Sequence, residues 1–168
     1  MHIEKLVEKY QSKGIIVDTN LLLVIFVGLH SPELIPKFKR TEKFATDDFY
    51  TLQKMVDLFR KIVVTQSILT EVSNLLGHLS EETGRLCHNV FANCMEKLTE
   101  EAFPSRSLVV LPHFSKFGLA DAGIIYQAKD KYLVLTDDWR LSQYLEVQGI
   151  DSMNFNHVRM MNWIGFIR

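Results

Sequence analysis

Short runs of consecutive apolar residues, separated by longer amphipathic segments, constrain the fold of this chain most. Four aliphatic runs occupy residues 15–17, 62–64, 108–111 and 133–135. A strand that is apolar at successive positions has both faces buried, as in a parallel sheet with helices on each side. The sequence therefore predicts a three-layer α/β/α sandwich around a central, mainly parallel sheet of four strands. A weaker run near residues 153–155 would extend the sheet to five strands.

Apolar residues recur at helical spacing in the segments between these runs. The pattern predicts helices over residues 3–10, 21–29, 46–59, 67–79, 85–98 and 118–131, and another that ends near Gly149. The chain contains no internal repeat, linker or low-complexity stretch. Because 168 residues is a typical length for one domain, we expect a single domain over residues 1–168.

The composition favours a soluble, cytoplasmic protein. Hydrophobic residues make up 47% of the chain and the net charge is −1, which together exclude a disordered protein. The longest apolar run, residues 21–29, is much shorter than the roughly 20 residues of a membrane helix. The N-terminus lacks the apolar segment of a signal peptide. Cys87 and Cys94 lie on one face of an expected helix, so we expect free thiols rather than a disulfide.

Acidic residues follow two of the predicted strands. Asp18 comes directly after the first, and Asp137 and Asp138 come shortly after the last of the four main runs. In an open α/β sheet, ligands bind outside the carboxyl ends of the strands. The chain contains neither the glycine-rich dinucleotide motif nor the phosphate-binding loop motif. A Rossmann cofactor site and a P-loop nucleotide site are therefore disfavoured.

Two further acids, Glu71 and Asp121, lie beside the apolar stripes of predicted helices. Burial of a carboxylate is unfavourable unless a positive group meets it, and no Lys or Arg is evident on the same helical faces. A metal ion is one positive group that could meet both carboxylates. Mg²⁺ and Mn²⁺ prefer oxygen ligands, and a cluster of three or four carboxylates can hold one or two such ions for phosphodiester hydrolysis.

Each acid also has a simpler structural explanation. Asp18 could bond its own backbone in a turn, and Asp138 could cap the helix that follows it. Asp121 could belong to a first helical turn, and Glu71 could extend its carboxylate into water. Taken singly, these explanations are preferable for all but Asp18. The occurrence of four acids at or near the strand ends of one sheet favours a shared function.

The order of these motifs resembles that of PIN domains, a fold of metal-dependent nucleases that includes many bacterial toxin ribonucleases. The segments that carry the resemblance span nearly the whole chain and are IIVDTNLLL, VTQSILTEVSNLL, LADAGIIYQA and TDDWRL. The resemblance implies a site for Mg²⁺ or Mn²⁺ and endonucleolytic cleavage of single-stranded or structured RNA. It also implies that the catalytic, metal-binding acids are Asp18, Glu71, Asp121 and Asp138, with polar support from Thr136.

Three neighbours of these acids have roles that the sequence leaves open. Asp137 could be an additional metal ligand, or it could point into solvent, because consecutive strand residues face opposite sides. We prefer Asp138 for the metal. Thr19 and Asn20 could orient Asp18 by hydrogen bonds, or they could simply belong to the turn between strand and helix.

A basic and aromatic segment is the best candidate for contacting RNA. Its cations would bind phosphates, and Phe38 and Phe44 within it would stack on bases. A solvated surface is an equally good explanation. The candidate substrate-binding residues are Lys37, Lys39, Arg40 and Lys43. Near the C-terminus, Trp163 and its apolar neighbours could form a homodimer contact or pack on the core.

These expectations favour a metal-dependent endoribonuclease and leave several alternative functions. A toxin with an antitoxin protein as partner and an RNA-processing enzyme are both compatible with the motifs. A PIN fold with weak or lost chemistry, acting as an RNA- or protein-binding module, is the main alternative. A haloacid-dehalogenase-like phosphatase is disfavoured, because Asn20 stands where that family has its second Asp. The charge balance does not exclude RNA, since 16 acids against 19 bases remain once four acids are assigned to metal.

Overall fold

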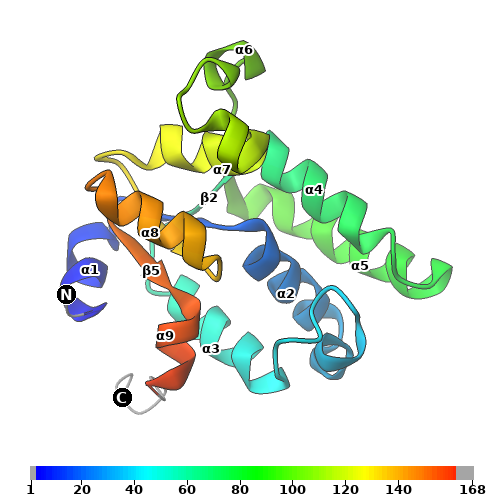
Figure 1. The fold of residues 1–168 in the computed structure, drawn as a ribbon. Coiled ribbons are helices and arrows are strands. Elements are labelled where there is room, and N and C mark those ends of the chain that lie inside the picture. The colour runs from blue at the N-terminus through cyan, green and yellow to red at the C-terminus, as the bar shows by residue number, and fades with distance from the viewer. Residues whose placement is uncertain (1–2, 162–168) are drawn as a thin grey trace.

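The computed structural model describes residues 3–161, which form a three-layer α/β/α sandwich around a five-stranded sheet (Figure 1). The strand order is β3-β2-β1-β4-β5, and each neighbouring pair is parallel. The predicted fold class is therefore confirmed, including the fifth strand. The strands are β1 (Ile15–Val17), β2 (Ile62–Thr65), β3 (Leu98–Glu101), β4 (Leu133–Thr136) and β5 (Ser152–Asn154).

The centre of the sheet is buried on both faces because its strands are aliphatic at successive positions. The side chains of residues 15–17 and 133–135 have no solvent exposure. β1 lies between β2 and β4, with Ile16 opposite both Val63 and Val134. The carboxyl ends of β1 and β4 therefore lie side by side, each immediately followed by acidic residues.

The predicted strand at residues 108–111 is wrong. That run overlaps the short helix α6 (Ser105–Val109), and the third strand is β3, earlier in the chain. Leu108 is buried, but Val109 and Val110 are 48% and 77% exposed, so the run does not belong to the sheet. β3 has the sequence LTEE and pairs with β2 alone among the described strands. An edge strand is partly solvated and needs no continuous apolar run.

Four helices cover one face of the sheet: α2 (Thr19–His30), α3 (Thr46–Val56), α4 (Gln66–Leu76) and α5 (Glu81–Cys94). The connections from β1 to β2 and from β2 to β3 run in the same direction across the sheet, so right-handed crossovers place their helices on the same face. α2 contacts the other three, and Figure 1 shows it beside α4 and α5. The apolar sequence of α2 matches its position, since nine of its residues are buried.

The opposite face carries α7 (Phe114–Ala128) and α8 (Trp139–Val147), because the chain returns across the sheet through β4 to β5. Gly118 has φ +76° and interrupts α7, so the regular part of this helix begins where the sequence predicts. α1 (Ile3–Tyr10) and α9 (Phe155–Met160) flank the β5 edge, where Lys9 and Tyr10 bond Asp151. Two short 3₁₀ helices complete the described chain, η1 (Pro32–Lys37) and η2 (Met95–Lys97).

Two smaller expectations can also be compared with the structure. Cys87 and Cys94 are both free thiols, as predicted. None of the helices within residues 3–161 is long and apolar enough to cross a membrane. The apolar tail around Trp163 lies outside the described residues.

We expect Gly28→Ala to destabilise the protein by at least about 1 kcal/mol. A Cβ atom at Gly28 in α2 would lie 2.2 Å from Cδ2 of the Phe49 ring in α3, far inside van der Waals contact. Overpacking of this kind typically costs about 1–3 kcal/mol, which offsets the higher helix propensity of alanine. Urea denaturation measures the change. Phe49→Leu should reduce the penalty in the double variant, and equal penalties in both backgrounds would contradict the clash.

Candidate functional site

Asp18 lies at the junction where β1 ends and α2 begins. Its carboxylate caps α2 by accepting a hydrogen bond of 3.0 Å from the backbone N–H of Asn20. The other carboxylate oxygen accepts a hydrogen bond from the hydroxyl of Thr136, the last residue of β4. Asp18 therefore caps α2 and also links β1 to β4. It lies at the carboxyl ends of these strands, where open α/β sheets usually bind ligands.

Burial dominates the electrostatics of Asp18. The residue is 6% exposed, and loss of hydration raises the pKa of its carboxyl from 3.8 to about 6. The charges of Asp137 and Asp138 raise this pKa further, whereas the hydrogen bonds from Thr136 and Asn20 lower it. The ionised carboxylate at neutral pH is thus only partly stabilised by its protein partners.

Glu71 and Asp121 come from different helices and line one open cleft of about 600 Å³. Glu71 in α4 accepts a hydrogen bond of 3.0 Å from the hydroxyl of Thr19, which begins α2. Asp121 lies in α7, which packs against α4. Asn74 and Phe117 contribute to the walls of the same cleft.

Asp121 has a strongly perturbed carboxyl group. Burial raises its pKa to about 7, and the charges of Asp18, Asp138 and Glu71 raise it as well. The guanidinium of Arg140 acts in the opposite direction and lowers it. Asp121 therefore lies within electrostatic range of the other three predicted acids, which come from separate segments of the chain.

Asp138 has the capping role that its position after β4 allows. Its carboxylate accepts hydrogen bonds from the backbone N–H groups of Arg140 at 2.7 Å and Leu141 at 3.2 Å, at the start of α8. Its own backbone N–H donates to the hydroxyl of Thr136 at 3.0 Å. Thr136 thus links Asp138 to Asp18.

Asp137 is buried and does not point into solvent, so that alternative is wrong. Its side chain is 2% exposed and forms an ion pair with Lys43. The amide of Asn20 donates a hydrogen bond of 3.2 Å to the same carboxylate. Asn20 therefore bridges the two strand ends, since its backbone N–H bonds Asp18 and its side chain bonds Asp137.

The basic and aromatic segment behaves differently from the expected RNA contact. Phe38 and Phe44 are 6% and 2% exposed and belong to the core, so they do not present faces for base stacking. Lys37 and Lys39 are exposed, as is Arg40, whose Nε bonds Nδ1 of His78 at 3.2 Å. Lys43 is the one cation of this predicted set that reaches the acidic strand ends in the described structure.

We expect Lys43→Gln to lower the free energy of unfolding by about 1–2 kcal/mol. Loss of one partner leaves a buried charge uncompensated, and the 55% exposure of Lys43 moderates the roughly 3–5 kcal/mol of a fully buried pair. Urea denaturation at pH 7 gives the change, with Lys39→Gln as a control in the same segment. The double variant Lys43→Gln, Asp137→Asn should recover most of the loss. A double variant no more stable than Lys43→Gln would contradict the pairing.

Within residues 3–161, no group of three or more His, Cys, Asp or Glu side chains is arranged to hold a metal ion. The donor set nevertheless fits Mg²⁺ or Mn²⁺ in chemical type, because it consists of carboxylate oxygens. Burial is the main cause of the raised pKa values of Asp18 and Asp121, and the charges of neighbouring acids, which a cation would offset, raise them further.

Arg140, a cation near the site, was missed by sequence reasoning, and Lys43 was predicted to bind substrate and not to pair with Asp137. Arg140, which lowers the pKa of Asp121, lies in the TDDWRL segment, so its proximity to Asp138 was available as a signal. The role of Lys43 as the counter-ion of Asp137 had no such signal. The two residues are far apart in sequence, and only the path of the loop before α3 brings them together.

The comparisons with known proteins assign no function to the chain. No protein-family model matches the sequence, and no curated protein matches it. One similar solved structure is described as a domain of a functionally unknown protein from Methanocaldococcus jannaschii DSM 2661. It has 21% sequence identity and a TM-score of 0.41, and the match covers 86% of this chain and 90% of that one.

Proposed function

We propose that this protein is a divalent-metal-dependent endoribonuclease of the PIN type, with Asp18, Glu71, Asp121 and Asp138 as its metal-binding acids. The observation that carries the proposal is the placement of the acids: Asp18 and Asp138 follow the adjacent strands β1 and β4, and Glu71 and Asp121 line one cleft. The pKa of Asp121, raised by burial and by the charges of the other three acids, supports it. Carboxylates that repel one another, of which Asp18 is buried and Glu71 is exposed, are stabilised together by a hard cation such as Mg²⁺ or Mn²⁺. The four acids also occur in the order typical of PIN domains.

The residues of the chain have separable roles in this proposal. A divalent cation at such a site, when bound, activates a water and stabilises the leaving oxygen of a phosphodiester. Thr136 and Asn20 orient Asp18 by donating to different carboxylate oxygens. Asp121 would hold the cation together with the other acids, and a bound cation would lower the pKa that burial and the neighbouring charges raise.

The shape of the cleft supports a polymeric substrate. Glu71 and Asp121 face an open cleft rather than an enclosed cavity, and polar side chains such as Thr70 and Asn74 line it. Small-molecule sites usually enclose most of their ligand. An open cleft instead allows an RNA strand to enter and leave along its length, as internal cleavage requires.

RNA cleavage by the purified protein tests the proposal. A 5′-labelled single-stranded RNA should yield internal fragments with Mn²⁺ or Mg²⁺ and none with EDTA, with single-stranded DNA of the same sequence as a comparison substrate. Intact RNA under every metal condition would contradict the nuclease. Calorimetric metal titration then identifies the alternative, since an RNA- or protein-binding module with lost chemistry would bind no cation at millimolar concentration. The antitoxin partner stays a prediction of the resemblance, tested by co-expression with the neighbouring gene. The homodimer stays a prediction from the apolar residues near the C-terminus, tested by light scattering.

A further inference from the structure

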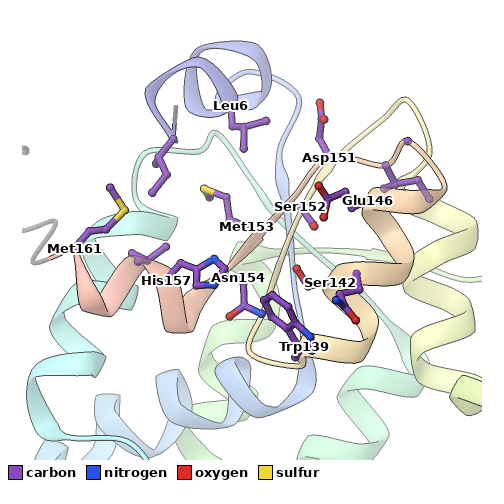
Figure 2. Close-up of a pocket in the computed structure, with 15 residues that line it drawn as sticks. Leu6, Trp139, Ser142, Glu146, Asp151, Ser152, Met153, Asn154, His157 and Met161 are labelled. Carbon is purple, nitrogen blue, oxygen red and sulfur yellow. The ribbon is translucent and has the colours of Figure 1, made fainter. Parts of the chain in front are cut away.

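A second cavity, of about 460 Å³, lies at the β5 edge between α1, α8 and α9. Figure 2 shows Trp139, Asn154 and His157 together at one end of it, with Glu146 and Asp151 toward the other. The volume is within the range of ligand-binding pockets. None of the four predicted acids lines this cavity, so it is distinct from the cleft at Glu71.

Trp139 provides an exposed aromatic surface at the cavity. It is the first residue of α8 and follows Asp138 directly, and its side chain is 54% exposed. Its ring meets that of His157 edge to face, with centroids 5.7 Å apart and an interplanar angle of 73°. An exposed indole that borders a cavity can stack on a flat ring.

Asn154 provides a buried hydrogen-bond donor at the same end. The residue is 6% exposed, and its Oδ1 accepts a hydrogen bond of 3.0 Å from the backbone N–H of Asn156. Its Nδ2 has no hydrogen-bond partner among the described residues. Buried donors are almost always paired, so an unpaired amide that lines a cavity indicates a ligand with an acceptor atom.

The lining of the cavity selects an uncharged ligand group. The described residues that line it include neither Lys nor Arg; Glu146 is acidic, and the carboxylate of Asp151 is already bonded by Lys9. A phosphate group would therefore meet no unpaired cation among the lining residues. A planar, neutral ring that carries hydrogen-bond acceptors meets both the stacking surface of Trp139 and the donor of Asn154, and nucleobases have this chemistry.

The cavity is also placed next to the proposed cleavage site. Asn154 ends β5 directly opposite Thr136 of β4, and Thr136 bonds Asp18. Adjacent strands lie roughly 4.8 Å apart, so Asn154 is one strand spacing from the residue that positions Asp18. We propose that this cavity binds a nucleobase of the RNA strand, with Trp139 stacking on the base and Asn154 Nδ2 donating to it. The inference rests on the proposed function for the identity of the strand.

Binding without cleavage tests the inference. Fluorescence anisotropy in EDTA compares a fluorescein-labelled oligouridylate of eight nucleotides with an abasic chain of the same length. Wild-type protein should bind the oligouridylate at least about fivefold more tightly, which corresponds to one stacked base. Trp139→Ala should remove this difference, and Trp139→Phe should retain most of it. Asn154→Ser keeps a residue suited to capping α9 but removes the amide donor, and should weaken binding of the oligouridylate alone.

The controls separate this inference from the nuclease proposal. Tyr126→Ala removes another aromatic side chain of similar exposure, 52%, from α7, and should leave both affinities unchanged. Wild-type protein with equal affinity for the two chains, or Trp139→Ala with the wild-type preference, would overturn the base site. A base preference that depends on Trp139 in a protein that never cleaves RNA would support the base site while refuting the nuclease.

Discussion

Asp18→Asn is expected to reduce metal-dependent RNA cleavage by more than about a hundredfold and to stabilise the metal-free protein at pH 8. Loss of groups that merely support a metal ligand already costs roughly 10- to 100-fold in metal affinity or activity, and Asp18 is proposed as a ligand itself. The replacement keeps the local structure, since Asn caps helices as well as Asp and its side chain can still bond Thr136. Initial cleavage rates with saturating Mn²⁺ measure the first effect.

The direction of the stability effect follows from the pKa of Asp18. The pKa of an aspartate side chain in an unfolded chain is 3.8, and burial raises the pKa of Asp18 to about 6 in the folded protein. The stability associated with the protonated group is therefore fully present below pH 3.8 and is lost as the pH rises through 6. The loss amounts to roughly 3 kcal/mol at pH 8, because each unit corresponds to about 1.4 kcal/mol. An amide stays neutral at every pH and avoids this loss.

Urea denaturation in EDTA measures the second effect. Asp18→Asn should be more stable than wild type at pH 8, by up to roughly 3 kcal/mol, and should differ little from it at pH 4. Asp57→Asn, at an exposed acid after α3, is the matched control and should change neither stability nor cleavage. Retained cleavage in Asp18→Asn would refute the metal-site assignment. A variant less stable than wild type at pH 8 would show instead that Asp18 is structurally required in its ionised form.

Mn²⁺ is expected to raise the melting temperature of the wild-type protein strongly at pH 8 and weakly at pH 5. A cation at a hundred times its dissociation constant stabilises a folded protein by about 2.7 kcal/mol, or roughly 5–10 °C for a chain of this size. At pH 5 the carboxyls of Asp18 and Asp121, with pKa values of about 6 and about 7, are mainly protonated and compete with the metal. Differential scanning fluorimetry across a metal titration at both pH values records the shift.

Asp121→Asn provides the informative comparison for the metal effect. It removes one proposed ligand and one of the mutually repelling charges, so the metal-free protein should be more stable at pH 8 and its response to Mn²⁺ smaller. Asp57→Asn should respond as wild type does. An equal rise in melting temperature at pH 5 and pH 8, or an undiminished rise in Asp121→Asn, would show that Mn²⁺ binds elsewhere.

The candidate site was predictable from the sequence to the extent that it follows local chain geometry. Asp18 directly follows the aliphatic run 15–17, and Asp138 comes shortly after the aliphatic run 133–135, so their place at the carboxyl ends of β1 and β4 follows from the pattern alone. The supporting position of Thr136 was implied by the resemblance to PIN domains and not by the pattern alone. The contact of Thr19 with Glu71 depends on the packing of α2 against α4, which no local pattern specifies.

The edge of the sheet shows why one strand was misplaced. An edge strand such as β3 is stabilised by pairing with one neighbour, so its sequence need not be apolar, and LTEE carried no strand signal. Val109 and Val110 gave a false strand signal, because the sequence does not distinguish an exposed valine from a buried one. Burial is a property of the packed molecule, and composition over four residues does not determine it.

The sequence by itself determined the parallel α/β/α fold and the acids at its strand ends, because both follow from the periodicity of apolar residues and from the turn between each strand and its helix. Only the tertiary structure decided the partners of those acids. It paired buried Asp137 with Lys43 and brought Asp121 within range of Asp18 and Glu71. It also joined Trp139 and Asn154 at one cavity. Such contacts depend on how distant segments pack, and hydrophobic patterning fixes which face of a segment is buried without fixing which polar groups then meet.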